Sequence, residues 1–448
     1  MVVRLNRLFS MVPLVASPLG LLAVLLGSGE SQPLQPTGLQ NQTLVAEWRS
    51  PWIVGLTPDP AIDQILAQYL AGLERQGWSR PHQGIWIQAQ DSAIAQHQGQ
   101  VPMPAASLTK LATTLAALKY WPLDHRFDTL VGMHGTLENG VLTGDLVVQG
   151  SGDPLFVWEE GIVLANHLQA LGVQRVTGDL VIVDAFTMNF SEDPNASAEQ
   201  LKQVMHTNSW NGAIRAAHGN LEANTAQPSL TIQGRVRRIP ATALPPDTTW
   251  LVRHQSLPLV AILKAMNIYS NNVMSDQVAA LVGGARVVKE TASTMADLPV
   301  GELSLINGSG LGVDNKMSAR AAVALTVALQ REMERQGYSV ADVLPVAGED
   351  AGTLIGRRIP ATAAVKTGTL AEVSALAGMV PTADKGPVWF AIINRGWAIS
   401  DLRVQQDQLI QAIQAHWGAA TVPDAMITKV RMQTENYRYG DPRRNVAP

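Results

Sequence analysis

Three short motifs place side chains suited to covalent acyl transfer along the chain. Residues 107–110 read S-x-x-K, residues 270–272 read S-x-N, and residues 366–368 read K-T-G. Together they supply two serine hydroxyls, two lysine amines, a threonine hydroxyl and a side-chain amide. A serine hydroxyl becomes a useful nucleophile only when a neighbouring base takes its proton. The motifs therefore predict a nucleophilic serine whose base is a lysine.

The first motif pairs that nucleophile with its base. We predict a buried helix over 107–119, because the stretch is rich in Ala and Leu and lacks Gly and Pro. Residues three apart lie on one face of a helix, so the Lys110 amine can reach the Ser107 hydroxyl. Lysine accepts a proton only when neutral, and its ordinary pKa is about 10.4. Burial and a second cation such as Lys366 would both lower the pKa of Lys110.

The other groups would stabilise charge that develops during the reaction. Free N–H groups at the helix N-terminus under Ser107 would face an oxyanion. A strand beginning with K-T-G offers the Lys366 cation, the Thr367 hydroxyl and a backbone that can approach closely, because Gly368 has no side chain. The N–H of Thr369 would be the second oxyanion donor.

Each motif alone has an ordinary structural explanation. S-x-x-K is usually an exposed helix pair, S-x-N a turn, and K-T-G the end of a hairpin. However, the chain has nine lysines, and Lys110 is the only one that follows a serine at this spacing. It also lies on an apolar helix, where an unpaired lysine would be costly. The joint occurrence of the three motifs therefore favours catalysis.

The surrounding pattern predicts a mixed α/β (α+β) fold, with an antiparallel sheet flanked by helices and an inserted β-rich accessory domain. Strands from both ends of the chain can share one sheet, with the middle of the chain inserted between them. A TGDLV sequence occurs twice in the middle, at 143–147 and 177–181. The predicted helices are 60–77, 107–119, 161–171, 256–281, 318–336 and 400–417; the predicted strands are 84–89, 93–99, 129–133, 141–149, 176–184, 364–370, 375–381 and 388–394.

These elements suggest five segments along the chain. Residues 45–122 and 255–425 would form the two parts of the main domain, and residues 123–254 the inserted one. Residues 426–448 read as a polar, mobile tail. Residues 1–31 place Arg4 and Arg7 before an apolar stretch, which is typical of a secretory signal or an uncleaved membrane anchor. Either reading sends the rest of the chain across a membrane.

Composition narrows the class of function. Hydrophobic residues make up 46% of the chain and charged residues 16%, so a large core is possible. A net charge of −4 gives no electrostatic footprint for nucleic acid. The absence of cysteine excludes thiolate catalysis and Cys-ligated zinc. The nine scattered histidines do not indicate a metal site, and we expect neither a metal nor a cofactor.

Longer stretches around the motifs resemble the low-molecular-mass class C penicillin-binding proteins, the D-alanyl-D-alanine carboxypeptidase/endopeptidase family. The resemblance covers roughly residues 60–420. It rests on the following stretches: PAASLTKLATTLAAL (104–118), GDLVVQGSGDPLF (144–156), RHQSLPLVAILKAMNIYSNNVMSD (253–276), INGSGLGVDNKMSA (306–319), LPVAGEDAGTLIGRR (344–358) and KTGTLAEVSALAGMV (366–380).

The resemblance implies a transpeptidase-like domain, export to the periplasm or cell envelope, and action on peptidoglycan peptides that end in D-Ala-D-Ala. It also implies that β-lactams act as inhibitors. The interval from Ser107 to Ser270 is shorter than in the longest family members, so one accessory domain would be reduced or missing. The implied roles are Ser107 as acylated nucleophile, Lys110 as base, Ser270 as proton relay to the departing D-alanine, Asn272 as holder of the substrate amide, Lys366 as positive charge, and Thr367 and Thr369, on either side of Gly368, as the grip on the terminal carboxylate.

Two rival functions remain at this stage. A β-lactamase would need an acid to activate the deacylating water, and Glu302, between the second and third motifs, superficially offers one. Its spacing differs from the lactamase pattern. A non-catalytic module that binds wall peptide or β-lactam is the other rival, although all the reactive residues are present. The sequence does not separate carboxypeptidase from endopeptidase activity, and it leaves the oligomeric state open.

Overall fold

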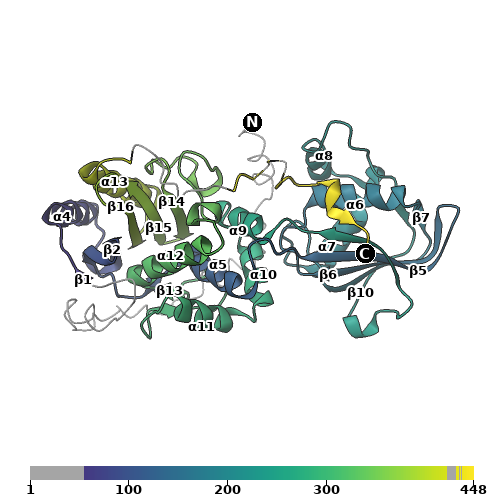
Figure 1. Cartoon of the computed structure of the whole chain (residues 1–448), viewed down its shortest axis with the longest axis horizontal. Coiled ribbons are helices and arrows are strands. Elements are labelled where there is room, and N and C mark those ends of the chain that lie inside the picture. The colour runs from purple at the N-terminus through teal and green to yellow at the C-terminus, as the bar shows by residue number, and fades with distance from the viewer. Residues whose placement is uncertain (1–54, 421–429, 433, 435) are drawn as a thin grey trace.

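The structure is a computed structural model that describes residues 55–420, 430–432, 434 and 436–448. The predicted signal or anchor over 1–31 lies outside these residues. In Figure 1 the chain forms two lobes side by side, each built around its own sheet. Within the described part, no helix combines the length and the apolar character needed to cross a membrane.

The first lobe is built around a six-stranded sheet that joins both ends of the chain. Its order is β1-β3-β2-β16-β15-β14, antiparallel except for the parallel β1–β3 pair. The predicted antiparallel sheet flanked by helices is thus confirmed, with β14 at its free edge. The strands are β1 Gly55–Leu56, β2 Gln83–Ala89, β3 Ser92–His97, β14 Ala364–Leu370, β15 Val373–Thr382 and β16 Gly386–Arg395.

Two helices from opposite ends of the chain cover one face of this sheet. They are α4 Pro60–Arg75 and α13 Ile399–Trp417. Helix α4 begins at Pro60, a residue that fits the first turn of a helix. The Asp59 carboxylate caps this helix by accepting hydrogen bonds from its first backbone N–H groups. Apolar side chains of both helices pack on the sheet in one buried cluster.

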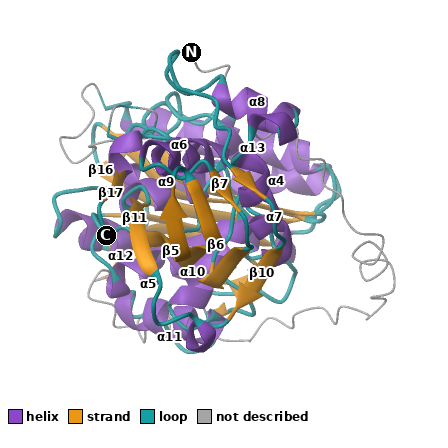
Figure 2. Ribbon diagram, turned by 90° about the vertical axis from the view of Figure 1, so that its right-hand side faces the viewer, coloured by secondary structure: helices purple, strands orange, loops and turns teal. Residues whose placement is uncertain are grey.

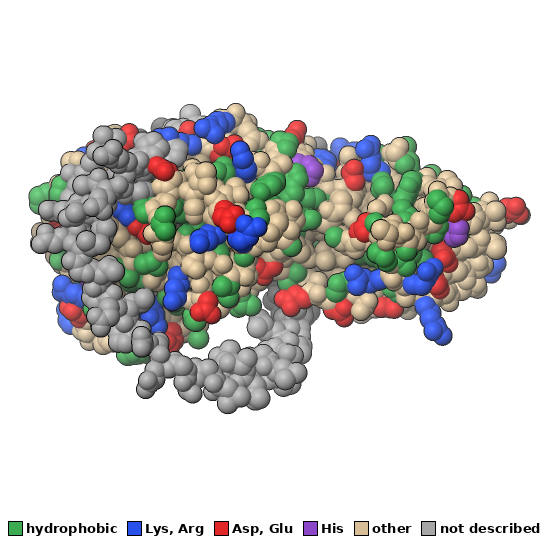
Figure 3. All heavy atoms as spheres, turned by 90° about the horizontal axis from the view of Figure 1, so that it is seen from below, with side chains coloured by type: hydrophobic (Ala, Val, Ile, Leu, Met, Phe, Trp, Pro, Cys, Tyr) green, Lys and Arg blue, Asp and Glu red, His purple; other side chains and the backbone are tan. Residues whose placement is uncertain are grey.

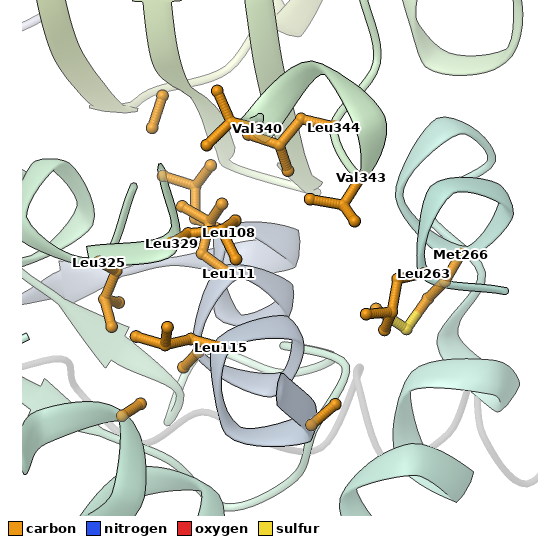
Figure 4. Close-up of a cluster of buried hydrophobic side chains, with 14 of the residues drawn as sticks. Leu108, Leu111, Leu115, Leu263, Met266, Leu325, Leu329, Val340, Val343 and Leu344 are labelled. Carbon is orange, nitrogen blue, oxygen red and sulfur yellow. The ribbon is translucent and has the colours of Figure 1, made fainter. Parts of the chain in front are cut away.

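The other face carries the larger core, around α5 Thr109–Tyr120. Every residue of α5 from Thr109 to Leu118 is buried, so this helix runs through the lobe instead of lying on its surface. Figure 4 shows its leucines meeting those of α12 and the segment 340–344. The helices of this layer are α5, α9 Leu259–Ile268, α10 Asn272–Leu281, α11 Ala285–Met295 and α12 Ala319–Glu334.

The second lobe contains an eight-stranded sheet with the main order β10-β8-β6-β5-β11-β17. Three helices cover one face of it and enclose a separate hydrophobic core (Figures 1 and 2). They are α6 Trp158–Ala170, α7 Pro194–Val204 and α8 Gly212–His218. The strands are β5 Asp128–Glu138, β6 Val141–Ser151, β7 Arg175–Val176, β8 Leu180–Ala185, β9 Thr231–Ile232, β10 Val236–Ile239, β11 Thr249–Gln255 and β17 Asn445–Val446.

The two TGDLV copies lie side by side in this sheet. Strands β6 and β8 are parallel neighbours, and the copies pair in register, Leu146 with Leu180. The Asp145 carboxylate accepts a hydrogen bond from the backbone N–H of Asp179, and Arg237 on β10 reaches both carboxylates. The sequence echo therefore marks two neighbouring strands of one parallel ladder.

The end of the chain departs from the predicted mobile tail. Strand β17 pairs antiparallel with β11, so the chain returns to the second lobe after α13 (Figure 1). Arg444 and Asn445 are buried there, and Tyr439 is buried in the larger core of the first lobe. The prediction of mobility was wrong for these residues, because a polar composition can also serve a buried hydrogen-bonded contact.

Charged side chains of both signs are interspersed over the face seen in Figure 3. A nucleic-acid site would show a continuous basic stripe. This face has none over the described residues, in keeping with the weakly negative net charge.

Candidate active site

Ser107 lies on a short 3₁₀ turn, η2 Ala106–Leu108, directly before α5. The sequence predicted that it would be part of the α-helix itself. Ala106 has a φ of 48°, a left-handed conformation that a residue with a side chain rarely adopts. Residues three apart stack on one another in a 3₁₀ turn, so the S-x-x-K spacing still brings the lysine back to the serine.

Two glycines enclose this turn. A Cβ on Gly310, whose φ is +83°, would overlap the carbonyl oxygen of Ala106. A Cβ on Gly368 of β14 would lie 3.0 Å from the carbonyl oxygen of Ala105. The backbone around Ser107 therefore fits between the loop that contains Gly310 and the edge of β14, and any larger residue at Gly310 would displace it.

A small three-stranded sheet ties these parts together. Its order is β12 Leu303–Ser304, β13 Lys316–Met317 and β4 Met103–Pro104. The N–H of Ala105 also donates to the carbonyl oxygen of Asn315, 2.8 Å away. The loop between β12 and β13 is thus fixed against the segment that leads into Ser107.

Lys110 is fully buried and has three polar neighbours. Its Nζ lies 2.8 Å from Asn272 Oδ1, 2.7 Å from the carbonyl oxygen of Ser309 and 3.1 Å from Ser107 Oγ. The first two atoms can only accept hydrogen bonds, so they take both N–H donors of a neutral amine. The remaining lone pair then faces the Ser107 hydroxyl, as a general base requires.

The environment also favours the neutral amine. Burial lowers the pKa of Lys110 to about 7, and the nearby Asp276 carboxylate opposes this fall. Lys366 is buried as well, and its pKa lies well below the ordinary value because of burial and the repulsion of Lys110. The sequence predicted that burial and the second lysine would both lower the pKa of Lys110. In the structure burial lowers the pKa of Lys110, whereas repulsion between the two lysines lowers the pKa of Lys366.

The loop that supplies the Ser309 carbonyl is held by Asp276 of α10. Asp276 Oδ1 accepts hydrogen bonds from the N–H groups of Gly308 and Ser309, at 2.9 and 2.8 Å. Sequence reasoning missed both contributions. A backbone carbonyl has no signature in residue type, and the only available signal was that Ser309 lies in one of the family-like stretches, INGSGLGVDNKMSA.

The second motif forms the turn that opens α10. Ser270 has a φ of 52°, and Asn271 caps the helix by accepting from the N–H of Met274 at 3.0 Å. Asn272, the first residue of α10, accepts a hydrogen bond from Lys110 through its Oδ1, and its side-chain NH₂ can donate to a substrate. Ser270 and Asn272 therefore lie on either side of the helix cap Asn271 in the sequence.

Lys366 connects the third motif to the second. Its Nζ donates to Ser270 Oγ at 2.9 Å and to the carbonyl oxygen of Thr367 at 2.7 Å. The described contacts thus link the three motifs in a chain, from Ser107 through Lys110 to Asn272, and from Ser270 to Lys366. Thr367 and Gly368 are buried on the edge strand, whereas Thr369 is exposed and accepts a hydrogen bond from Arg403 of α13 at 2.8 Å.

Glu302 does not face this site. It is buried in an ion pair with Arg320, and its Oε2 accepts from Ser318 Oγ at 2.6 Å. Arg320 in turn lies over the ring of Trp86, 5.8 Å from its centre. These contacts give Glu302 a structural role in the core and remove the observation that favoured a lactamase.

Comparison with known proteins identifies one family. The profile of the D-Ala-D-Ala carboxypeptidase 3 (S13) family matches residues 62–197 and 195–416. A carboxypeptidase DacB from Mycolicibacterium smegmatis is 26% identical over 352 residues, which covers 66% of this chain and 72% of that protein. A D-alanyl-D-alanine carboxypeptidase DacB from Haemophilus influenzae is 23% identical over 411 residues, covering 70% and 85%.

Solved structures show the same fold. The penicillin G-acylated predatory endopeptidase Bd3459 from Bdellovibrio bacteriovorus, in complex with an immunity protein, superposes with a TM-score of 0.67. It is 22% identical, and the match covers 77% of this chain and 95% of that one. Penicillin-binding protein 4 from Haemophilus influenzae gives a TM-score of 0.56 at 20% identity, covering 75% and 96%.

Proposed function

The chain belongs to the D-Ala-D-Ala carboxypeptidase 3 (S13) family, and we propose that Ser107 cleaves peptidoglycan peptides ending in D-Ala-D-Ala through an acyl-enzyme. Membership makes the chain a serine-type carboxypeptidase, a hydrolase of the penicillin-binding class. The observation that carries the residue assignment is the buried Lys110 amine, whose two acceptor partners direct its lone pair to Ser107.

The first step forms the ester. Lys110 takes the Ser107 proton as Oγ attacks the carbonyl carbon of the penultimate D-alanine, and the N–H groups of Ser107 and Thr369 stabilise the oxyanion. The C–N bond then breaks. The leaving nitrogen receives a proton from Ser270, and Ser270 regains one from the Lys110 ammonium, so that Lys110 is neutral again before the second step. Lys366 holds Ser270 in place by a hydrogen bond. The products of this step are free D-alanine and a peptidyl ester on Ser107.

The second step reverses these transfers with water. Departure of the small D-alanine opens space for a water molecule, which attacks the ester carbonyl and restores the Ser107 hydroxyl. A β-lactam differs because its leaving group stays tethered after ring opening and still occupies that space. We therefore expect β-lactams to inhibit by forming a persistent ester.

Edge strand β14 supports binding of an extended peptide. It is the last strand of the sheet; its start pairs with the segment around Val346, and beyond Val365 no other described strand pairs with its outer side. The Ser107 turn packs against this strand at Gly368. A substrate peptide can pair with such an edge through backbone hydrogen bonds. A cross-linked peptide would pair with the same strand edge, so endopeptidase activity is part of the proposal. Export through the basic and apolar N-terminal segment would place the enzyme at its cell-wall substrate.

Labelled penicillin and intact-protein mass spectrometry test the nucleophile. The label should reside on the peptide that contains Ser107 and should be lost in Ser107→Ala. Attachment to a different serine would refute the assignment. Incubation with linear and cross-linked muropeptides, followed by identification of the products, then separates carboxypeptidase from endopeptidase activity.

Glu302→Gln tests the lactamase alternative. Because Glu302 is engaged with Arg320 and Ser318, the penicilloyl ester should persist for minutes or longer in both wild type and variant. Breaking the buried ion pair should instead lower stability, by up to about 3–5 kcal/mol, measured by denaturant unfolding. Rapid penicillin turnover that disappears in the variant would favour a lactamase.

A further inference from the structure

A third buried lysine lies outside the proposed chemistry. Lys264 on α9 is 1% exposed, and its Nζ donates to Asp350 Oδ2 at 2.6 Å. The carbonyl oxygens of Ala341 and Leu344 accept from the same Nζ at 2.8 and 2.7 Å. All three donors of the ammonium group are therefore engaged, and its charge is paired with a carboxylate.

Asp350 lies in the segment 344–354, part of a family-like stretch that the proposed chemistry leaves without a role. Its Oδ2 also accepts from the N–H of Val346 at 2.8 Å, and its own N–H donates to the Val346 carbonyl oxygen at 2.9 Å. Asp350 therefore closes this segment into a turn and, through Lys264, fixes the turn to α9.

The end of the segment packs against the last turn of α9, directly before the second motif. Thr353 Oγ1 donates to the carbonyl oxygen of Ile268 at 3.2 Å. Ile268 is the last residue of α9, where backbone carbonyls lack partners within the helix. A Cβ on Gly352, whose φ is +69°, would overlap the same oxygen. The segment thus supports the backbone two residues before Ser270.

The start of the segment pairs with the strand that carries the third motif. The N–H of Val365 on β14 donates to the carbonyl oxygen of Pro345 at 2.8 Å, and Lys366 follows directly. The segment therefore bridges the second and third motifs, and the pair of Lys264 and Asp350 fixes it between them.

Ser270 depends on such support because its backbone conformation is unfavourable. Its φ of 52° is left-handed, and such a conformation persists only where the surrounding structure enforces it. Its hydroxyl accepts from Lys366 at 2.9 Å. We propose that Lys264 and Asp350 are positioning residues, which hold the Ser270 turn so that its hydroxyl stays beside Lys366 and can protonate the leaving nitrogen. This inference rests on the proposed function, because it assumes that Ser270 delivers that proton.

Two substrates with different leaving groups test this role. One is a diacyl-Lys-D-Ala-D-Ala peptide, and the other is its thioester analogue, in which sulfur replaces the nitrogen of the scissile bond. The amide nitrogen must gain a proton to leave, whereas a thiolate can leave as an anion, since the ordinary pKa of a thiol is about 8.5. Misplacing Ser270 should therefore slow the amide and spare the thioester. Comparing kcat/KM measures the loss in the acylation step for each substrate.

Asp350→Asn removes the charge that pairs with Lys264. It should lower kcat/KM for the amide by about tenfold or more, and for the thioester by less than about threefold, because small misplacements of a reacting group are costly. Ser270→Ala should show the same asymmetry. Asp384→Asn, an exposed change in the turn between β15 and β16, removes the same charge and should behave as wild type.

Thr353→Val tests the same support without breaking the buried ion pair. It removes the hydroxyl that donates to Ile268, so it decides the question if Asp350→Asn does not fold. We expect kcat/KM for the amide to fall by about threefold, the scale of one hydrogen bond, with the thioester unchanged. Thermal unfolding of each variant monitors the fold.

The outcomes are distinguishable. An equal loss for amide and thioester in folded Asp350→Asn, or no loss for either, would overturn the inference and leave Lys264 and Asp350 with a structural role alone. The same result in Thr353→Val would overturn it where Asp350→Asn is unfolded. Failure of the proposed function itself would look different: wild type would turn over neither substrate and penicillin would not label Ser107.

Discussion

At the scale of single residues, the proposed mechanism requires a neutral Lys110 whose N–H groups still have hydrogen-bond acceptors. Lys110 is buried, yet all its polar contacts are with uncharged groups. A carboxylate in direct contact would hold the proton on the amine, and Asp276 avoids this by binding backbone N–H groups instead. Burial lowers the pKa of Lys110, and the Asn272 and Ser309 oxygens orient its amine so that the lone pair faces Ser107.

The pH dependence of acylation follows from Lys110. With a pKa of about 7, the amine is neutral above this pH and protonated below it, so the acylation rate should rise with pH through about 7 and then level off.

Lys110→Arg keeps the charge but accepts no proton, and should lower the rate by at least about a hundredfold. Stopped-flow penicillin acylation measures both. Lys119→Arg, an exposed change on the same helix, should leave the profile unchanged; an unaltered profile in Lys110→Arg would identify another base.

Asp276 tests the electrostatic contribution separately. Its carboxylate raises the pKa of Lys110, whereas Asp276→Asn keeps an oxygen that can accept from Gly308 and Ser309. The pKa of Lys110 should therefore fall further, and the rise in acylation rate should move to lower pH. Asp314→Asn, an exposed change near the same loop, serves as the control. A shift to higher pH would contradict this reading.

At the scale of elements, the site is assembled where three segments meet closely at two glycines, Gly310 and Gly368. The Ser107 turn lies between the Gly310 loop and the edge of β14, and the backbone at Ala106 adopts a strained left-handed conformation. Such strain persists only where the surrounding structure enforces it. Here the small sheet of β4, β13 and β12 and the packing of α5 provide that enforcement.

Gly310→Ala should disrupt this assembly. The new Cβ would overlap the Ala106 carbonyl, and the φ of +83° would strain any side chain. Gly312→Ala is the matched control, since its φ is +99° but nothing lies within 4 Å of its Cβ. Both variants should lose about 1 kcal/mol or more from strain. Only Gly310→Ala should also lose penicillin acylation by tenfold or more; equal rates in the two variants would show that the contact with Ala106 is unimportant.

At the scale of the whole molecule, the chain crosses between the lobes again after α13. The final strand completes the second sheet, and Arg444 forms a buried ion pair with Glu160, which also accepts from the N–H of Gly440 at 3.1 Å. His254 lies beside this pair with Nδ1 2.7 Å from Asn445 Oδ1, and burial lowers its pKa to about 4. The C-terminal segment is therefore part of the second lobe's structure.

Arg444→Ala should loosen the second lobe and spare the chemistry. It leaves Glu160 buried without its cation, which costs about 3–5 kcal/mol. Arg443→Ala, whose side chain is mostly exposed, is the control and should cost far less. Thermal unfolding should show an earlier transition for Arg444→Ala while Ser107 acylation at low temperature stays near normal. Loss of acylation in a folded variant would show that the second lobe helps to build the site.

The sequence by itself predicted Ser107 as the nucleophile and Lys110 as its base, and it predicted the helix and the strands that bring them together. Apolar periodicity predicts helix α13 and the three strands before it. Lys110 stood out because a lysine on an apolar helix is costly to bury unless it has a polar partner. These inferences rest on residue type and local spacing, and on the Ala- and Leu-rich sequence of α5.

The tertiary structure alone decided the remaining partners. The Ser309 carbonyl belongs to a backbone that every residue has, and Arg403 and Asp276 meet the site across long stretches of chain. The 3₁₀ turn at Ser107 depends on what packs against it, not on helix propensity. Residues 440–446 pack on the second lobe, where Arg444 supplies the cation that pairs with buried Glu160. Contacts of this kind are set by packing and charge compensation between distant segments, which no local pattern records.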